Sequence, residues 1–217
     1  MFGIENYLGF VMAAILLNLT PGSDSMYIIT RSISQGSQAG FYSVLGIISG
    51  ILVHTLLAAL GLSIILANSP LAFMIVKYIG ASYLCYLGVK MLMSKQQPLI
   101  AESLQENEKS SSAKTLDHWQ IYKQGVLTNT FNPKVALFFL AFFPQFIDAS
   151  YAYSMVSFII LGLTFAVTGF IWCSCLALLA SKFSENLRKN PSIEVILNKI
   201  SGLVFIGLGI KLLTEKG

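Results

Sequence analysis

The chain has 217 residues, of which 55% are hydrophobic and only 11% are charged, and its mean hydropathy is +0.71. A soluble domain carries about 25% charged residues, so a chain this apolar cannot cover its own surface in water, and lipid is its natural solvent. The net charge of +4 comes from scattered residues that form no basic stripe, which gives nucleic-acid binding no support. The three cysteines lie inside apolar runs, where an odd number indicates packing residues rather than a disulfide framework.

Six apolar runs, each long enough to cross a bilayer, follow one another along the chain. They cover residues 7–29, 39–67, 71–93, 125–146, 153–180 and 195–213. In lipid each run must be helical, because only a helix satisfies its own backbone there. The first run lacks the basic start and small-residue cleavage site of a signal peptide, so we interpret it as a retained helix. A polar stretch at 31–37 separates the first two runs, and the long polar stretch at 94–124 predicts a solvated loop.

The six runs fall into two related halves. Residues 86–92 resemble residues 207–213, and Pro21 and Gly50 have counterparts 112 residues later in Pro133 and Gly162. We therefore divide the chain into a three-helix repeat at 1–93, the polar loop at 94–124 and a second three-helix repeat at 125–217. Three is an odd number of crossings, so the second repeat enters the membrane from the opposite side, as in many secondary transporters. The sequence predicts an all-α membrane protein of six helices in two inverted repeats, and chance similarity between apolar helices is the alternative.

Lys and Arg residues favour one side of this arrangement. Only Lys77, Lys211 and Lys216 fall on the side of the even-numbered loops, and Lys134 lies within a run. The remaining ten fall on the side of loops one, three and five: Arg31, Lys90, Lys95, Lys109, Lys114, Lys123, Lys182, Arg188, Lys189 and Lys199. Because basic residues accumulate in cytoplasmic loops, we expect the odd-numbered loops in the cytoplasm and both termini outside.

Proline interrupts the first helix of each repeat, at Pro21 and Pro133. Proline removes a helical hydrogen bond, and Gly22 adds permissive backbone beside the first break. Backbone groups exposed at bilayer depth are tolerated only where protein buries them or where they line a cavity. We expect a half-helix N-terminus at a break to attract a carboxylate and the exposed carbonyls to attract a cation. Two simple proline kinks are the alternative.

An acidic residue follows the first break and a basic residue follows the second. Asp24 and Lys134 lie inside the membrane, where ionisable side chains are costly and usually face the interior of the bundle. An amino acid is a zwitterion, so one carboxylate, one ammonium and several neutral polar groups match both of its ends. The neutral groups nearest the breaks are Asn18, Thr20, Ser23, Asn129 and Asn132. The alternative is a structural Asp24–Lys134 ion pair that only holds the two halves together.

His54 is a candidate for proton coupling, together with Asp24. It shares one helix face with Gly46 and Gly50, at a spacing of four residues, and that face can approach a neighbouring helix closely. An intramembrane histidine can carry protons, but a lone one is more often a hydrogen-bonded core residue.

The motifs around the two breaks resemble those of the LysE/RhtB family of lysine, homoserine and threonine exporters. The first is LTPGSD at 19–24, followed by Arg31, Gly36, Gly46 and Gly50. The second is GVLTN at 125–129, then NPK at 132–134 and FFPQF at 142–146. The resemblance covers nearly the whole chain and implies amino-acid efflux across a bacterial cytoplasmic membrane by proton antiport, with no cofactor. Ser23 stands where this family usually has a second proline.

Other classes of protein fit less well. An enzyme is disfavoured because His54 is the only intramembrane histidine and no nucleophile-elbow motif is present. A channel would need a continuous polar file. Electron-shuttling proteins of related architecture use a cysteine in the first helix of each repeat, where this chain has none. An exporter of a metal or another small ion remains the alternative, although Cys173 and Cys175 point to different helix faces. The sequence leaves open whether the chain forms a homo-oligomer.

Overall fold

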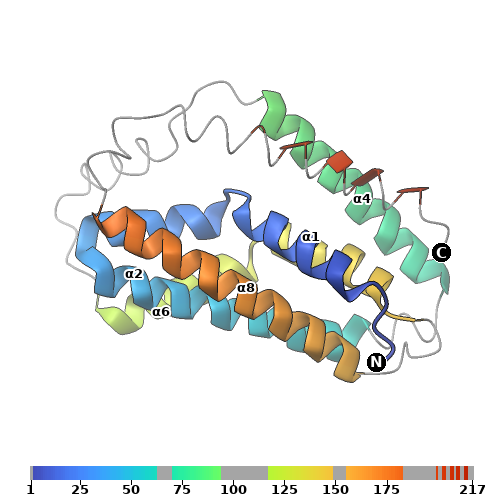
Figure 1. The fold of residues 1–217 in the computed structure, drawn as a ribbon, viewed down its shortest axis with the longest axis horizontal. Coiled ribbons are helices and arrows are strands. Elements are labelled where there is room, and N and C mark those ends of the chain that lie inside the picture. Colours follow the sequence, from blue (N-terminus) through green and yellow to red (C-terminus); the bar gives the residue numbers. More distant parts are fainter. Residues whose placement is uncertain are drawn as a thin grey trace.

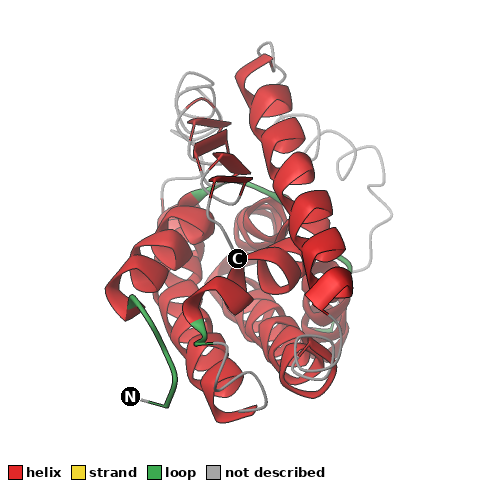
Figure 2. Cartoon of the chain, turned by 90° about the vertical axis from the view of Figure 1, so that its right-hand side faces the viewer, coloured by secondary structure: helices red, strands yellow, loops and turns green. Residues whose placement is uncertain are grey.

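The computed structural model describes residues 2–62, 70–93, 117–148 and 155–182, and a few residues between 199 and 214. Within these ranges the chain forms helices joined by short loops (Figures 1 and 2). The one extended pairing among the described residues is an isolated antiparallel bridge between Ile4 and Ile147, which ties the N-terminal segment to the residues before α8. The described part of the chain is therefore all-α, as predicted.

The first predicted helix is broken at the expected position. Helix α1 (Tyr7–Leu19) is capped by the side chain of Asn6 and ends where Thr20 and Gly22 adopt extended backbone. Helix α2 (Ser23–Leu57) then begins and continues into a short π-helix, η1 (Ala58–Leu62). The break at Pro21 is thus confirmed. Residues 63–69, which include the predicted end of the second run, lie outside the described residues.

Helix α2 reverses direction at Gly36, whose φ of 82° belongs to the left-handed region that glycine tolerates. A β-carbon added at Gly40 would meet the Ser32 side chain. Residues eight apart in a straight helix are separated by about 12 Å, so this contact shows that the chain folds back. The polar stretch expected at 31–37 is therefore not a loop. It is helical on both sides of Gly36, and the hydroxyls of Ser32 and Ser34 donate to carbonyls one turn earlier.

The second half also contains a broken helix. Helix α6 (His118–Thr130) is followed, after Phe131 and Asn132, by α7 (Pro133–Leu137), a π-helix η2 (Phe138–Phe142) and a 3-10 helix η3 (Phe143–Phe146). The break at Pro133 is confirmed. Helix α6 begins earlier than the expected Gly125, because Ile121, Gly125 and Asn129 form one buried face that extends the helix into the polar stretch.

By length and composition, two helical stretches of the described chain can cross a membrane, Ser23–Leu62 and Met155–Ser181, and the reversal at Gly36 divides the first of them. The pair His118–Thr130 and Pro133–Phe146, bent by 45°, would make a third if it forms one span. Helix α8 runs from Met155 to Lys182 and α4 from Pro70 to Met93, in agreement with the fifth and third predicted runs. The six-helix inverted-repeat arrangement stays a prediction, since most of residues 195–213 lie outside the described residues.

Glycines bring the two halves into close contact. A β-carbon at Gly46 would meet the backbone of α6 at the Tyr122 carbonyl, and one at Gly50 would lie 2.6 Å from the β-carbon of Asn129. Gly162 of α8 packs in the same way against the Thr55 side chain. The predicted packing face of α2 is confirmed.

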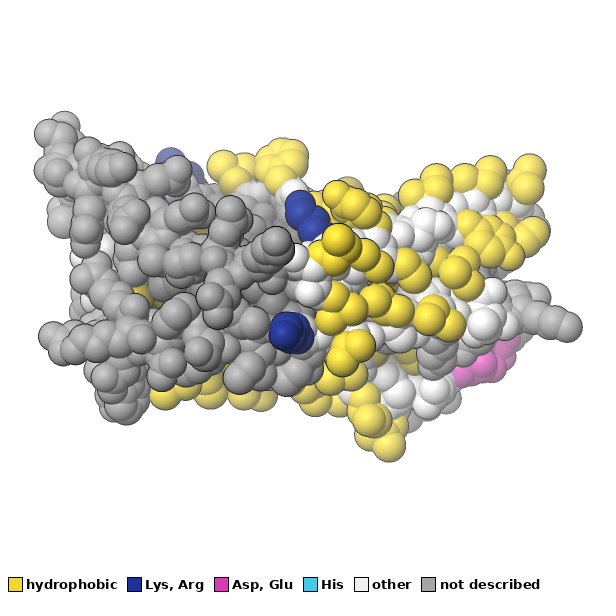
Figure 3. Space-filling model, turned by 90° about the horizontal axis from the view of Figure 1, so that it is seen from above, with side chains coloured by type: hydrophobic (Ala, Val, Ile, Leu, Met, Phe, Trp, Pro, Cys, Tyr) yellow, Lys and Arg dark blue, Asp and Glu magenta, His cyan; other side chains and the backbone are white. Residues whose placement is uncertain are grey.

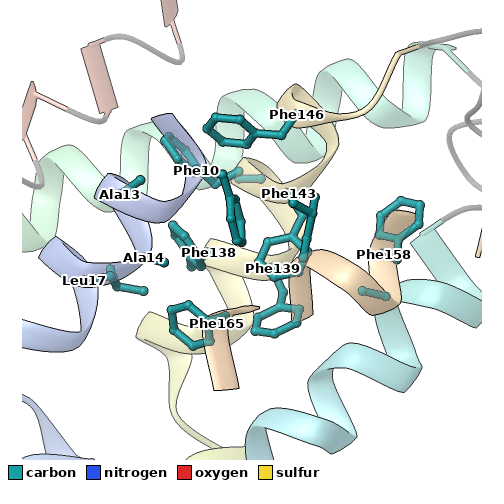
Figure 4. Packing of buried hydrophobic residues seen from close by; sticks show 14 of the residues in the cluster. Phe10, Ala13, Ala14, Leu17, Phe138, Phe139, Phe143, Phe146, Phe158 and Phe165 are labelled. Atoms are coloured by element: carbon teal, nitrogen blue, oxygen red, sulfur yellow. The ribbon is translucent and has the colours of Figure 1, made fainter. Parts of the chain in front are cut away.

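Apolar side chains fill the bundle and also cover its outside. Phe10 of α1 meets Phe138, Phe143 and Phe146 at ring-centroid distances of 5.1 to 6.2 Å, which joins the two broken helices at one end of the bundle (Figure 4). On the outer surface, large apolar residues such as Leu8 and Leu57 are exposed, and the described part of the face in Figure 3 is mostly hydrophobic with few charged side chains. This apolar exterior fits a chain that is surrounded by lipid.

Candidate functional site

The two helix breaks lie side by side in the middle of the bundle. The Lys134 ammonium, at the start of α7, donates to the carbonyl oxygens of Thr20 at 3.0 Å and Leu17 at 3.4 Å. These carbonyls belong to the C-terminal end of α1, which carries the negative end of the helix dipole. The exposed carbonyls at this break therefore bind a cation that is a residue of the other half of the chain.

Asp24 occupies the opposite kind of helix end, the first turn of α2, and is buried. Its Oδ2 atom accepts hydrogen bonds from the side-chain amides of Asn132 at 2.9 Å and Asn129 at 3.0 Å. Asn132 also caps α7, because its Oδ1 accepts from the backbone N–H of Lys134 at 3.0 Å. One asparagine therefore fixes both the Asp24 carboxylate and the start of the helix that carries Lys134.

Asp24 and Lys134 do not form a direct ion pair. Among the described residues, no Asp24 oxygen lies within 4.0 Å of the Lys134 Nζ. Each charge is instead held by neutral groups, Asp24 by two amides and Lys134 by two carbonyls. The alternative of a structural Asp24–Lys134 ion pair therefore has no direct contact behind it, and both charges line one cavity.

This cavity lies where the broken helices meet and has room for about one water molecule. It is lined by Leu17, Asn18, Asp24, Ser25, Ile47, Ile51, Asn129, Lys134, Val135, Phe165 and Cys173. Two buried acceptors of the lining residues, Oδ1 of Asp24 and Oδ1 of Asn129, have no hydrogen-bond partner in the described part of the chain. Leaving such groups unpaired is unfavourable, so the cavity is suited to a ligand that brings hydrogen-bond donors.

His54 does not line the cavity but contacts the site through Asn129. Its Nε2 lies 3.1 Å from the Asn129 carbonyl oxygen, and its ring packs against Phe139 with centroids 5.5 Å apart. Asn129 thus connects His54 through its backbone to Asp24 through its side chain. This short connection is the structural basis for considering His54 in proton coupling.

The other predicted residues take different places. Asn18 lines the cavity and donates to the Thr168 hydroxyl at 3.1 Å. Thr20 is buried, and its hydroxyl donates to the Leu16 carbonyl. Ser23 and Pro133 are exposed at the first positions of their helices, and nothing brings the Ser23 side chain to the cavity. Its predicted contribution to the site is therefore not supported by the geometry.

Gly22 has a role that its backbone dihedrals do not reveal. A β-carbon at this position would lie 3.2 Å from the Lys134 Nζ, so glycine leaves room for the ammonium beside the break.

The apolar lining residues were not among the predicted site residues. Ile47 and Ile51 could have been found, because they lie one helical turn apart on the same stretch of α2 as Gly50 and His54. Phe165 and Cys173 come from α8, which carries no break and no charge before its last residue, Lys182, so nothing in the sequence marks the stretch that contains them.

No group of three or more His, Cys, Asp and Glu side chains close enough to hold a metal ion occurs in the described ranges. The polar groups at the breaks are one carboxylate, one ammonium and several amides. This set fits a zwitterion better than a bare cation.

Comparisons with known proteins place this chain in a transporter family. Residues 15–216 match the family model described as LysE type translocator. The leucine efflux protein of Salmonella typhimurium (strain LT2) is 29% identical over 213 residues, which cover 98% of this chain and 97% of that protein. An uncharacterized membrane protein, PA4757, of Pseudomonas aeruginosa is 31% identical over 212 residues, covering 98% and 96%.

The membrane protein YrhP of Bacillus subtilis (strain 168) is 29% identical over 208 residues, covering 96% of this chain and 98% of that protein. No solved structure matches the chain. The family consists of translocators rather than enzymes, and the match spans almost the whole chain, both breaks included. The chain is therefore a membrane transport protein that belongs to the LysE type translocator family.

Proposed function

We propose that the protein exports a small neutral amino acid from the cytoplasm and binds it between Asp24 and Lys134. The observation that carries this proposal is the pair of opposite charges, one beside each broken helix, that line one cavity without a direct ion pair. A substrate carboxylate would meet the Lys134 ammonium, and a substrate ammonium would meet the free Oδ1 atoms of Asp24 and Asn129. The leucine efflux proteins among the relatives support an amino acid as the substrate.

A neutral substrate follows from the number of charges. The lining residues include one carboxylate and one ammonium, which match the two charges of a neutral amino acid. A lysine or arginine substrate would bring a third charge with no partner at the cavity. Burying such a charge costs several kcal/mol, so these substrates should be transported poorly.

Transport by this site requires the two halves of the chain to separate. The cavity has room for about one water, so an amino acid cannot enter without movement of the surrounding helices. At one end of the bundle the halves are held together through the part of α6 that precedes residue 125, where Tyr27 donates to the Ile121 carbonyl at 2.7 Å and Arg31 donates to Gln124 at 3.0 Å. At the other end they meet through the Phe10 cluster. Alternating opening of these two contacts, in a six-helix inverted repeat at 1–93 and 125–217 with the loop 94–124 between, is the transport cycle we propose.

The distribution of basic residues supports one orientation of the protein in the membrane. Arg31 and Lys123 lie at the end of the bundle that holds the reversal at Gly36, whereas the paired segments around Ile4 and Ile147 lie at the opposite end. We assign the basic end to the cytoplasm of a bacterium and both termini to the outside. In sealed cells, a membrane-impermeant thiol reagent should label Gly217→Cys but not Ser111→Cys, and labelling of Ser111→Cys from outside contradicts this orientation.

Export against a concentration gradient needs an energy source, and we propose proton antiport. Asp24 and His54 are the two protonatable side chains that Asn129 connects. An inward proton could be taken up at this pair while the amino acid leaves.

The experiment that tests the proposed function is efflux from vesicles that contain the purified protein and a panel of labelled amino acids, with and without an imposed pH gradient. We expect neutral amino acids to leave faster than lysine, and the gradient to accelerate their efflux. Vesicles that retain every amino acid as well as protein-free vesicles do would overturn the proposal.

A further inference from the structure

The cavity at the helix breaks has an apolar wall in addition to its charged groups. Ile47 and Ile51 of α2, Val135 of α7 and Phe165 of α8 line it, and all four side chains are almost completely buried. Three helices contribute to this wall, so it would widen when the halves of the chain separate without losing its apolar character.

The polar part of the cavity is oriented to receive an ammonium group. The Asn129 amide donates through Nδ2 to Asp24 Oδ2, so its oxygen, Oδ1, is necessarily the acceptor that remains. Oδ1 of Asp24 is the second acceptor without a partner among the described residues. Asn129 is fully buried and Asp24 is more than nine-tenths buried, so neither oxygen is satisfied by bulk solvent. An ammonium group has three N–H donors and can serve both oxygens.

We infer that the cavity selects amino acids with branched aliphatic side chains, whose ammonium fills the two acceptors while the side chain packs against Ile47, Ile51, Val135 and Phe165. This inference rests on the proposed function and adds the substrate class to it. None of the four wall residues is polar, so their role is separate from the recognition of the substrate's two charges.

Hydroxylated or amide side chains have little to bind in this wall. Ser25 carries the only hydroxyl among the lining residues, and the amide of Asn18 is engaged with Thr168. Valine and threonine have the same shape, so their comparison isolates the effect of polarity. An apolar pocket separates such isosteres by up to roughly 100-fold, and we expect a preference for valine of at least about tenfold.

The test is counterflow in vesicles that contain the full-length protein. Labelled leucine is outside, and the unlabelled amino acid under test is inside and drives uptake of the label. Leucine, isoleucine and valine should drive uptake of the label at least about tenfold more effectively than threonine, serine or asparagine. In Ile51→Ala the wall is hollowed, so phenylalanine should gain on leucine by about tenfold. The matched control is Leu52→Ala, because Leu52 is the next residue of α2 but is 39% exposed on the outside, and it should keep the wild-type ratio. Val135→Ala provides a second wall variant if Ile51→Ala does not fold.

Cys173 supplies an independent measurement of binding, since it lines the same cavity. In a variant with Cys85→Ala and Cys175→Ala, aliphatic amino acids should slow alkylation of Cys173 by a small maleimide, and threonine should not. If threonine competes as well as valine, the inference on substrate class is wrong while the proposed export function stands. If leucine is exported but the wall variants keep the wild-type ratios, the side chain does not bind in this cavity and the inference is also overturned. If no amino acid is exchanged and none protects Cys173, both the inference and the proposed function fail.

Discussion

Removing both charges at the helix breaks should not restore transport, although a structural pair would predict that it does. The relevant variants are Asp24→Asn, Lys134→Met and their combination. Asp24 accepts two amide hydrogen bonds, and Asn in its place can still accept both through its own oxygen. A hydrogen bond to a charged group contributes about 1.5–3 kcal/mol and a neutral one about 0.5–1.5, so the two bonds together weaken by about 2–3 kcal/mol. That loss is small enough for folded protein to remain in the membrane.

The direct interaction between the two charges is limited by their separation. No nitrogen–oxygen distance is within 4.0 Å, and two unit charges at 4 Å interact by about 4 kcal/mol at an effective dielectric constant of 20. The direct coupling of Asp24 and Lys134 should therefore be less than about 4 kcal/mol. Most of what holds each side chain comes from the amides and carbonyls around it, and these partners remain when the opposite charge is removed.

Export, unlike folding, should be lost, because each removed charge is the partner of one end of the substrate. An unpaired buried charge costs about 3–5 kcal/mol, which corresponds to a loss of transport of roughly 100-fold or more for each single variant. The double variant should be equally inactive at a normal protein level. Counterflow of labelled leucine in vesicles is the assay, and Asp117→Asn with Lys123→Met is the matched control, since both residues are exposed at the start of α6. Full transport by the Asp24→Asn/Lys134→Met protein would refute the reasoning and leave only a structural role for the pair.

Three further outcomes are expected. Gly50→Ala places a methyl group 2.6 Å from the Asn129 β-carbon and should lower the free energy of unfolding in detergent by about 1–3 kcal/mol. Gly61→Ala, where an added β-carbon would meet nothing within 4 Å, should leave the free energy of unfolding unchanged. Equal effects of the two variants would contradict the proposed close packing. His54→Gln keeps a donor for the Asn129 carbonyl but cannot titrate near neutral pH, so exchange should persist while pH-driven accumulation is lost. Parallel loss of both activities would show that His54 is structural. Lysine should leave loaded vesicles more slowly than leucine, and equal rates would argue against a site with two charges.

The broken helices and their charges could be predicted from the sequence because proline and intramembrane charge have few explanations in lipid. Pro21 and Pro133 mark both breaks, and Asp24 and Lys134 line one cavity. The close face of α2 was equally predictable, since Gly46 leaves room for the backbone of α6 and Gly50 leaves room for the Asn129 side chain. These features depend on local rules that act within one or two helical turns.

The structure differs from the sequence interpretation at the polar stretch around Gly36 and where contacts between distant segments decide the outcome. The serines around Gly36 have the composition of a loop, yet their hydroxyls bond to the preceding helical turn, and the chain stays helical up to the reversal. Whether Lys134 would pair with Asp24 or with the carbonyls of α1 depends on distances that no sequence pattern contains. The contribution of Phe165 to the cavity likewise depends on how α8 lies against the breaks.

The central claim is that the site recognises both ends of one amino acid, and competition by analogues that lack one end tests it most directly. In vesicles that exchange labelled leucine, 3-methylbutylamine keeps the ammonium and the branched side chain, and 4-methylpentanoate keeps the carboxylate and the side chain. We predict that unlabelled leucine competes fully and that each one-charge analogue competes at least roughly 100-fold more weakly, because one buried charge of the site is left unpaired. Competition by either analogue as strong as that by leucine would contradict the account.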